Sequence, residues 1–410
     1  MTQLPRTGAW RKALGAGLLG SWMLLVSGIA SGAPRTPASD NEIVETLPTV
    51  AGWSARERQA RRELLQRPRD APAALAAAQG YLDLARTQGD ARYAGYALGA
   101  LQAWQPLSQT TPPSILVMHA TVTQFLHDFD GAERTLQLAL AAHPGDAQAW
   151  LTLATIRRVR GRYADADTAC RALVGLRQNL YASACLAENA GLRGEHQAAQ
   201  SALQELLAHP SMGLPSGAAT RQWLLTTVAE INELAGDDKA AESAYRLALA
   251  AQAGGYDVLA YCDFLLRQQR PAAVVPLLKT EPRSDAVLLR QVIAAQQLAT
   301  VAPLPPQQRR AAQRDADELA ARFEAAALRP GTATLHAREH AMFALDVQHD
   351  AGRALALSRL NVQLQREPID LLIFARAATA ARDDTARSEV RALMQQIGLR
   401  DARVDQALTP

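Results

Sequence analysis

The chain has 410 residues and a formal net charge of +3, from 43 basic and 40 acidic residues. Arg6, Arg11 and Lys12 lie in a stretch of 33 residues without acids, so the remainder of the chain is electrically balanced. A balanced chain has no general attraction to phosphate backbones, which argues against nucleic-acid binding. Aromatic residues make up only 5%, and no run alternates Val, Ile and Thr, so a β-rich fold is not expected.

The first 33 residues have the three parts of a secretory signal peptide. A basic start is followed by an apolar run over residues 13–30 and then by small residues. We expect cleavage after Ala30, since Pro34 disfavours the other candidate cut, after Ala33. No Cys follows the apolar run, so processing as a lipoprotein is not predicted.

The alternative for this segment is an uncleaved helix that tethers the protein to a membrane as an adaptor. The apolar run carries four glycines and two serines, which makes it marginal as a membrane span. No later apolar run has spanning length, so no stable membrane insertion is expected after cleavage. We therefore predict a bacterial protein exported to the periplasm, with outright secretion as the second choice.

A pattern of about 34 residues then recurs along the chain. In the unit 144–173, a helical stripe around Trp150 is broken at Gly161, and a second stripe begins at Tyr163. This pattern is typical of two helices joined by a turn. The turn residues of six successive units are Gly89, His127, Gly161, Gly194, Gly236 and Gln269.

Mostly small residues stand at fixed distances from each turn. Two helices that cross closely need small side chains at the crossing and large ones beside it. Seven residues before the turns stand Leu82, Ala120, Ala154, Ala187, Ala229 and Cys262, and five after them stand Ala94, Ala132, Ala166, Ala199, Ala241 and Val274.

These six units in one register resemble the tetratricopeptide repeat (TPR) family. The resemblance covers 71–295 closely and 334–398 loosely. It implies an all-α, right-handed superhelical solenoid of roughly eight antiparallel helix pairs. It also implies a non-catalytic scaffold whose first helices line a concave groove for a protein or peptide partner. The alternative is a bundle of alanine-rich helices without a repeat.

In that register, the groove-facing positions of the first helices are mostly polar. Arg86, Gln124 and Arg158 come from successive units and would form a polar ladder, in which Arg could hold a carboxylate with two hydrogen bonds. A solvated helix face is the alternative. A lysine clamp for a carboxylate is not expected, because Lys239 and Lys279 lie off the groove. The predicted groove residues are Asp83, Arg86, Thr121, Gln124, Thr155, Arg158, Glu188, Trp223, Glu233, Tyr256, Asp263 and Arg267.

The C-terminal part is less regular. A loop and a charged helix, near 307–328, interrupt the register and form either a degenerate repeat or a capping insert. The predicted organisation is a signal peptide (1–33), a leader with an N-terminal helix (34–70), a main array (71–295), the interrupting segment (296–333), two further units (334–398) and a tail (399–410).

His336, Glu339 and His340 match the H-x-x-E-H pattern of inverted zinc peptidases. Two His four residues apart on a helix could hold zinc. Such a site needs a distant third ligand, and no motif surrounds the later glutamates Glu367 and Glu389. A zinc hydrolase is therefore the rival hypothesis, while our prediction is a solvated first helical turn, no cofactor, no metal and no enzymatic activity.

The chain has three cysteines without metal-binding spacing. Cys170 and Cys185 fall in neighbouring helices and could pair in an oxidising compartment. We favour the other interpretation, two unpaired thiols packed in the core. Cys262 stands at a crossing position and is expected to be packed as well.

Overall fold

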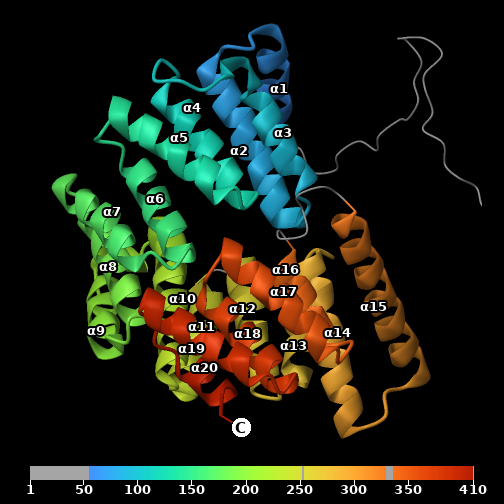
Figure 1. The fold of residues 1–410 in the computed structure, drawn as a ribbon. Coiled ribbons are helices and arrows are strands. Elements are labelled where there is room, and N and C mark those ends of the chain that lie inside the picture. The colour runs from blue at the N-terminus through green and yellow to red at the C-terminus, as the bar shows by residue number, and fades with distance from the viewer. Residues whose placement is uncertain (1–54, 252–253, 329–335, 410) are drawn as a thin grey trace, which may run out of the picture. The chain divides into compact units, whose positions relative to one another are not determined.

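The computed structural model describes residues 55–251, 254–328 and 336–409, which belong to one compact unit, Trp53–Pro410 (Figure 1). All regular secondary structure in these residues is helical, which confirms the all-α prediction. The predicted signal peptide and most of the leader lie outside the described residues, as do residues 329–335.

The helices of the described part form nine antiparallel pairs. The connections before α4 and α10 are long and contain the short 3-10 turns η1 (Gln102–Trp104), η2 (Pro210–Gly213) and η3 (Pro215–Gly217). Helix α1 (Ala55–Gln66) packs on α2, and α20 (Ala402–Ala407) packs on α18. The pairs are α2 (Ala71–Gln88) with α3 (Arg92–Ala100), α4 (Pro113–Phe125) with α5 (Phe129–Ala142), α6 (Ala147–Val159) with α7 (Tyr163–Gly175), α8 (Asn179–Leu192) with α9 (His196–Leu207), α10 (Ala218–Ala235) with α11 (Asp238–Ala251), α12 (Tyr256–Arg267) with α13 (Pro271–Leu277), α14 (Asp285–Val301) with α15 (Pro306–Ala327), α16 (Ala337–Asp346) with α17 (Ala351–Leu364), and α18 (Pro368–Ala380) with α19 (Asp384–Ile397).

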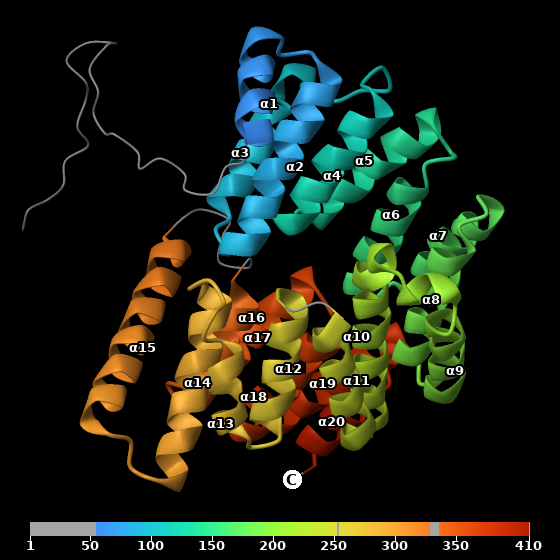
Figure 2. The ribbon, with the colours of Figure 1, turned by 180° about the vertical axis from the view of Figure 1, so that it is seen from behind.

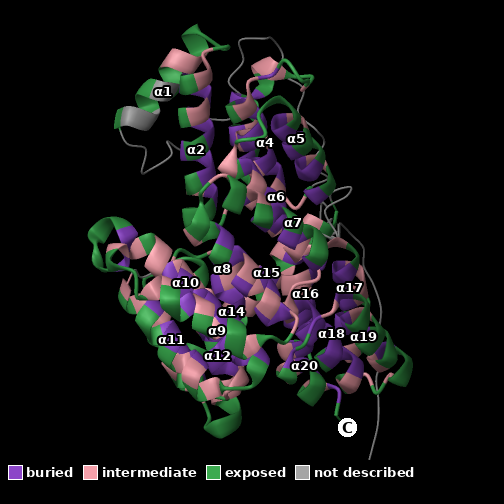
Figure 3. Ribbon diagram, turned by 90° about the vertical axis from the view of Figure 1, so that its left-hand side faces the viewer, coloured by how far each residue is buried: buried purple, intermediate pink, exposed green. Residues whose placement is uncertain are grey.

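The repeat register is visible in the backbone. All six predicted turn residues have positive φ, including the non-glycine residues His127 (61°) and Gln269 (54°). His349 and Arg382 occupy the same left-handed turns in the last two pairs. The predicted crossing residues are all buried, and most of them have small side chains. Figure 3 shows how buried positions are distributed along the helices. Register and packing therefore agree along the array.

Aspartate begins several first and second helices. Asp70, Asp146 and Asp383 each accept a hydrogen bond from the backbone N–H three residues later. Such a cap satisfies one of the free N–H groups at a helix start and contributes about 1 kcal/mol. These caps fix where each helix begins and therefore which side chains face the neighbouring pair.

The charged helix near 307–328 is the second helix of a pair. Helix α15 packs on α14, and its buried residues are Leu319 and Phe323. Phe323 contacts Phe343 of α16, with ring centroids 5.7 Å apart. The contacts thus favour the degenerate repeat over the capping insert. The predicted end of the main array at residue 295 falls inside α14. The apolar stripe of α15 is narrow, so the sequence did not show that α14 and α15 form one further pair.

The last helices return to the middle of the array. Figures 1 and 2, from opposite sides, place α18–α20 against the face of α10–α12. The backbone N–H of Arg366 donates to the carbonyl of Val159 (2.7 Å), and that of Arg400 donates to the carbonyl of Leu192 (2.9 Å). One apolar cluster includes Leu192, Leu234 and Leu371. The array therefore closes on itself through α6, α8 and α10.

Two of the turn glycines permit this closure. A Cβ on Gly161 would lie 2.9 Å from Cγ2 of Ile397, and one on Gly194 would lie 2.9 Å from Cγ of Arg400. Both glycines also have positive φ, where a side chain is strained. Glycine at these turns serves both the turn itself and the approach of the C-terminal helices.

The favoured interpretation of two unpaired thiols was wrong. Cys170 of α7 and Cys185 of α8 form a disulfide, with Cα atoms 5.8 Å apart. Their helices pack directly on each other, which brings the two thiols within bonding distance. Cys262 is a buried free thiol, as expected.

Replacing both Cys170 and Cys185 with alanine should lower the free energy of unfolding by about 3 kcal/mol, because the bridge closes a 15-residue loop in the unfolded chain. Urea unfolding measures this loss, and Cys262→Ala, which keeps the bridge, is the matched control. Thiol titration of the denatured, non-reduced protein should find one free thiol; three would contradict the bridge.

Candidate binding pocket

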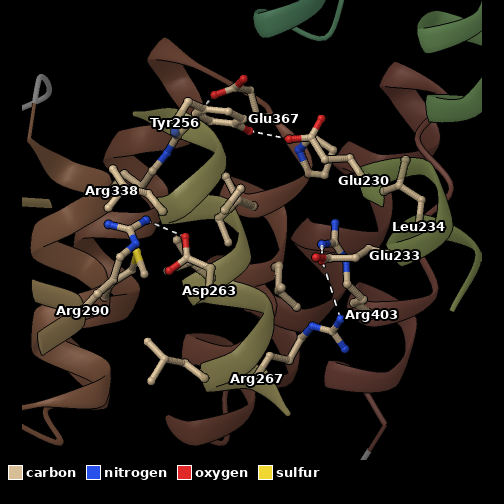
Figure 4. Close-up of a pocket in the computed structure, with 18 of the residues that line it drawn as sticks. Glu230, Glu233, Leu234, Tyr256, Asp263, Arg267, Arg290, Arg338, Glu367 and Arg403 are labelled. Atoms are coloured by element: carbon tan, nitrogen blue, oxygen red, sulfur yellow. Dashed lines mark hydrogen bonds and ion pairs between the residues drawn. The ribbon is translucent and has the colours of Figure 1, made fainter. Parts of the chain in front are cut away.

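A cavity of about 390 Å³ lies where the array closes. Most of its lining comes from the seven first helices α6 to α18, and Tyr163 of α7, Tyr245 of α11 and Arg403 of α20 also contribute to it. Figure 4 shows part of this lining. Its walls mix apolar residues such as Ile231 and Met342 with charged ones. The expectation that first helices line the interior holds for this part of the chain, and we call the cavity the central pocket.

Six of the twelve predicted groove residues line the central pocket. They come from four successive first helices, α6, α8, α10 and α12. These residues are Arg158, Glu188, Glu233, Tyr256, Asp263 and Arg267.

The other six lie away from it. Asp83 and Arg86 form an exposed pair with each other (3.7 Å), and Trp223 stacks on Tyr181, with centroids 6.2 Å apart. Thr121 and Thr155 donate their hydroxyls to carbonyls of their own helices, and Gln124 of α4 is half-buried. Of the proposed ladder, only Arg158 reaches the pocket, because the C-terminal helices close on α6–α10 and not on α2 or α4.

Ion pairs between neighbouring units form the wall of the central pocket. Arg158 pairs with Glu188 (3.0 Å), so α6 is tied to α8. Arg290 pairs with Asp263 (2.5 Å), which ties α14 to α12. Each pair bridges adjacent first helices and holds its charges at the cavity surface.

Arg338 of α16 is the centre of a buried cluster. Its guanidinium donates to Asp370 (Nε to Oδ1, 2.6 Å) and pairs with Glu367 (2.5 Å). Asp370 is 1% exposed and also accepts from Asn361 (2.6 Å) and from the backbone N–H of Glu367 (2.8 Å). Arg338 is not among the predicted groove residues, and its only signal in the sequence is that Asp370 stands three residues after Glu367, the spacing of a capping box.

A second cluster surrounds Glu233 of α10, which is 4% exposed. It accepts a hydrogen bond from the Tyr245 hydroxyl (3.0 Å) and forms ion pairs with Arg267 (3.6 Å) and Arg403. Arg403 in turn pairs with Asp401 (2.7 Å). This cluster joins α10, α11, α12 and α20 beside the central pocket.

Glu230 and Tyr256 lie next to each other on the wall of the pocket, and their polar ends meet (Figure 4). The Tyr256 hydroxyl donates to the Glu230 carboxylate at 2.6 Å. Burial raises the pKa of Glu230 to about 8; the Tyr256 hydrogen bond opposes this rise, and the carboxylates of Glu188, Glu233 and Glu367 add to it. Tyr256 is 66% exposed, and the negative charge of Glu230 at its hydroxyl raises its pKa well above the ordinary value. The pair therefore holds an exchangeable proton near neutral pH.

Stability should fall as the pH rises, because of Glu230. A carboxyl with a pKa of about 8 in the folded chain keeps its proton after the unfolded chain has lost it near pH 4.5. The raised pKa therefore leaves stability unaffected below pH 4.5 and lowers it progressively between pH 4.5 and pH 8. The total loss in the free energy of unfolding is about 2–3 kcal/mol, after allowance for water in the cavity.

Urea unfolding of wild type and Glu230→Gln at pH 5 and pH 8 measures this effect. The variant should gain stability relative to wild type as the pH rises, since Gln cannot ionise. Glu205→Gln, an exposed position on α9, is the control. Identical pH profiles for wild type and Glu230→Gln would contradict the assignment.

No family model matches the sequence, and no curated protein matches it. Solved structures of other proteins are similar in part, and three of them follow. The type IV pilus biogenesis factor PilW is 15% identical, with 72% of this chain and 98% of PilW covered and a TM-score of 0.29. A Rap protein complexed with competence and sporulation factor is 10% identical, with 86% of this chain and 92% of the Rap chain covered and a TM-score of 0.48. A chain of the APC/C hetero-tetramer Cut9–Hcn1 is 12% identical, with 86% of this chain and 66% of that chain covered and a TM-score of 0.45.

These scores all lie below 0.5, so the fold is assigned from the chain's own geometry. Its successive helix pairs share one turn conformation and one set of buried crossing residues. The chain is a TPR-like helical-repeat protein. No helix among α1–α20 of this TPR-like protein has the length and apolar run that a membrane crossing requires.

The three residues of the zinc motif have different surroundings in the TPR-like protein. His336 precedes the first residue of α16, Glu339 lines the central pocket, and His340 stacks on Phe323 of α15 with ring centroids 4.8 Å apart. Burial lowers the pKa of His340 to about 4, and the charges of Arg353 and His336 add to this effect. Among the described residues, no three His, Cys, Asp or Glu side chains are placed to hold a metal ion. Nothing in this geometry favours the hydrolase hypothesis.

Proposed function

We propose that this TPR-like protein is a non-catalytic scaffold that binds a protein or peptide partner in its central pocket. The observation that carries the proposal is a set of buried polar atoms in the lining without a hydrogen-bond partner in the described chain. Buried polar groups are normally bonded, so such a set favours a site completed by a ligand. The atoms are Tyr163 Oη, Glu188 Oε2, Asp263 Oδ1, Arg290 Nε and Gln297 Oε1.

The apolar part of the lining suits the same kind of partner. Leu259, Ile293 and Met342 come from three different helices and line the cavity with the charged residues. An apolar pocket with a few placed polar groups is the usual form of a ligand site. A peptide offers both, since its side chains can fill the apolar part and its amides can bond the free polar atoms.

A capture experiment tests the scaffold proposal. The exported chain is immobilised and exposed to an envelope extract, and bound proteins are identified by mass spectrometry. Arg158→Ala removes a buried charged contact and should reduce the capture of a pocket-dependent partner by about tenfold or more. Leu259→Trp should reduce it at least as much, because the larger side chain fills the cavity. Arg86→Ala lies outside the pocket and should change nothing.

Thermal unfolding of each variant separates a lost contact from a lost fold. Folded Leu259→Trp protein with an unchanged set of bound proteins would overturn the proposal. A partner lost equally with Arg86→Ala would place binding outside the central pocket.

We also propose that the protein works in the bacterial periplasm after export. The signal-like first 33 residues support this location, and so does the bridge between Cys170 and Cys185, because disulfides persist in oxidising compartments. Intact-mass measurement of the exported protein tests the proposal: a chain that begins at Ser31 supports it, and an uncut chain in the membrane fraction supports the tethered adaptor.

A further inference from the structure

We propose that the central pocket selects a ligand whose apolar body carries an organic cation, a protonated amine or a guanidinium, held by the Glu230 carboxylate. A basic side chain of a bound peptide has this chemistry. The inference rests on the scaffold proposal, because it specifies what the same pocket recognises.

The charges of the lining carry the argument. Six arginines and seven carboxylates line the central pocket. Each of the six arginines has a carboxylate within ion-pair distance. Among the lining carboxylates, Glu230 and Glu339 have no such cation in the described chain. The charge that this pocket still lacks is therefore positive, and in surroundings of low polarity that preference is strong.

The unpaired atoms point to the same chemistry. Glu188 Oε2, Asp263 Oδ1 and Gln297 Oε1 are acceptors, and they need donors. Arg290 Nε is the one unpaired atom in the described lining that only donates, and the Tyr163 hydroxyl, 3% exposed, can do either. Ammonium and guanidinium groups carry three to five donors and no acceptor. Such a group can donate hydrogen bonds to more of the unpaired lining acceptors than a carboxylate or a neutral amide can.

A metal ion does not fit the same carboxylates. A metal needs several ligand atoms that converge within about 2–2.6 Å of one point. No three His, Cys, Asp or Glu side chains of the described chain are arranged in this way. A guanidinium or ammonium on a flexible stem spans longer distances, and its methylene groups can lie on apolar wall residues such as Ile231 and Leu259.

The proton on Glu230 adds a measurable consequence. Tyr256, Glu188, Glu233 and Glu367 face this carboxyl, and its pKa of about 8 leaves it largely protonated at pH 7. A bound cation favours the ionised form, so binding releases a proton. Affinity for the cation should therefore rise between pH 6.5 and 8.5, by up to about tenfold per pH unit below the pKa.

The test uses two capped peptides, acetyl-Leu-Arg-Leu-amide and the same peptide with citrulline, a neutral isostere, in place of arginine. Titration calorimetry on the full exported chain at pH 8.5 should show at least tenfold tighter binding of the arginine peptide. Glu230→Gln, which keeps an acceptor for Tyr256, should reduce this preference below threefold. Glu205→Gln should retain it.

Three results would overturn the inference: equal binding of the two peptides, a preference that survives Glu230→Gln, or no binding of either peptide at millimolar concentration. In the first case, loss of both peptides in Leu259→Trp would leave the scaffold proposal standing. In the third case, capture of a partner that depends on Arg158 would leave it standing as well. The two proposals can thus fail separately.

Discussion

Replacement of Arg338 by alanine is expected to lower the free energy of unfolding by about 3–5 kcal/mol, the usual loss when a buried ion pair is left with one partner. Asp370 is almost fully buried, and Arg338 is the cation that compensates its charge. Without the guanidinium, the carboxylate is left in the interior with only Asn361 and one backbone N–H as donors. Urea unfolding at pH 7 measures the loss.

Arg359→Ala is the matched control. Arg359 pairs with Glu389 at 2.8 Å, but both side chains are about two-fifths exposed. An exposed pair contributes about 1 kcal/mol or less. If Arg338→Ala costs no more than this control, the Arg338 cluster does not hold α16 to α18 as described. Arg338→Lys should recover only part of the loss, because an ammonium cannot reproduce the planar fork.

Glu233→Ala is expected to cost about 3–5 kcal/mol and to release α20 from α10. The change leaves Arg403 buried beside Arg267, and it removes the acceptor of the Tyr245 hydroxyl. Relative to wild type, hydrogen exchange should therefore become faster in α20 and stay unchanged in α2, which lies far from this cluster in the array. Urea unfolding gives the total loss.

Glu242→Ala, at a surface ion pair with Arg270, is the control for this variant and should cost about 1 kcal/mol or less. Slow exchange in α20 of Glu233→Ala would show that the apolar contacts of Leu399 and Val404 hold this helix without the ion pairs.

Local rules account for how well the fold could be predicted. A turn at Gly161 or Gly236 and small residues at fixed distances specify a helix pair, because crossing geometry depends only on nearby side chains. The same rules identified the turn at Gln269, although its residue is not glycine. They predicted the helix α15 but left its role open between a degenerate repeat and a capping insert, since two buried residues in a 22-residue helix give little periodicity.

The central pocket could be predicted only in part. Register alone placed Arg158, Glu188 and Asp263 on inward faces, and they line the pocket. It also placed Arg86 there, because register says nothing about where the array closes. Closure depends on the summed rotation of many pairs, which no single unit of sequence encodes. Glu230 and Arg338 were missed for another reason: Glu233 was predicted instead on the helix that carries Glu230, and no groove position was assigned to the loosely matching units that contain Arg338.

The contact between Arg403 and Glu233 joins residues 170 positions apart. An open repeat array touches only its nearest neighbours, so its end units can fray one at a time. Here the final turn is fastened to a middle unit, and peeling it away also exposes α8 and α10. Loss of the last ten residues should therefore broaden the unfolding transition and weaken units far from the cut, as expected when a linear, stepwise process replaces an all-or-none one.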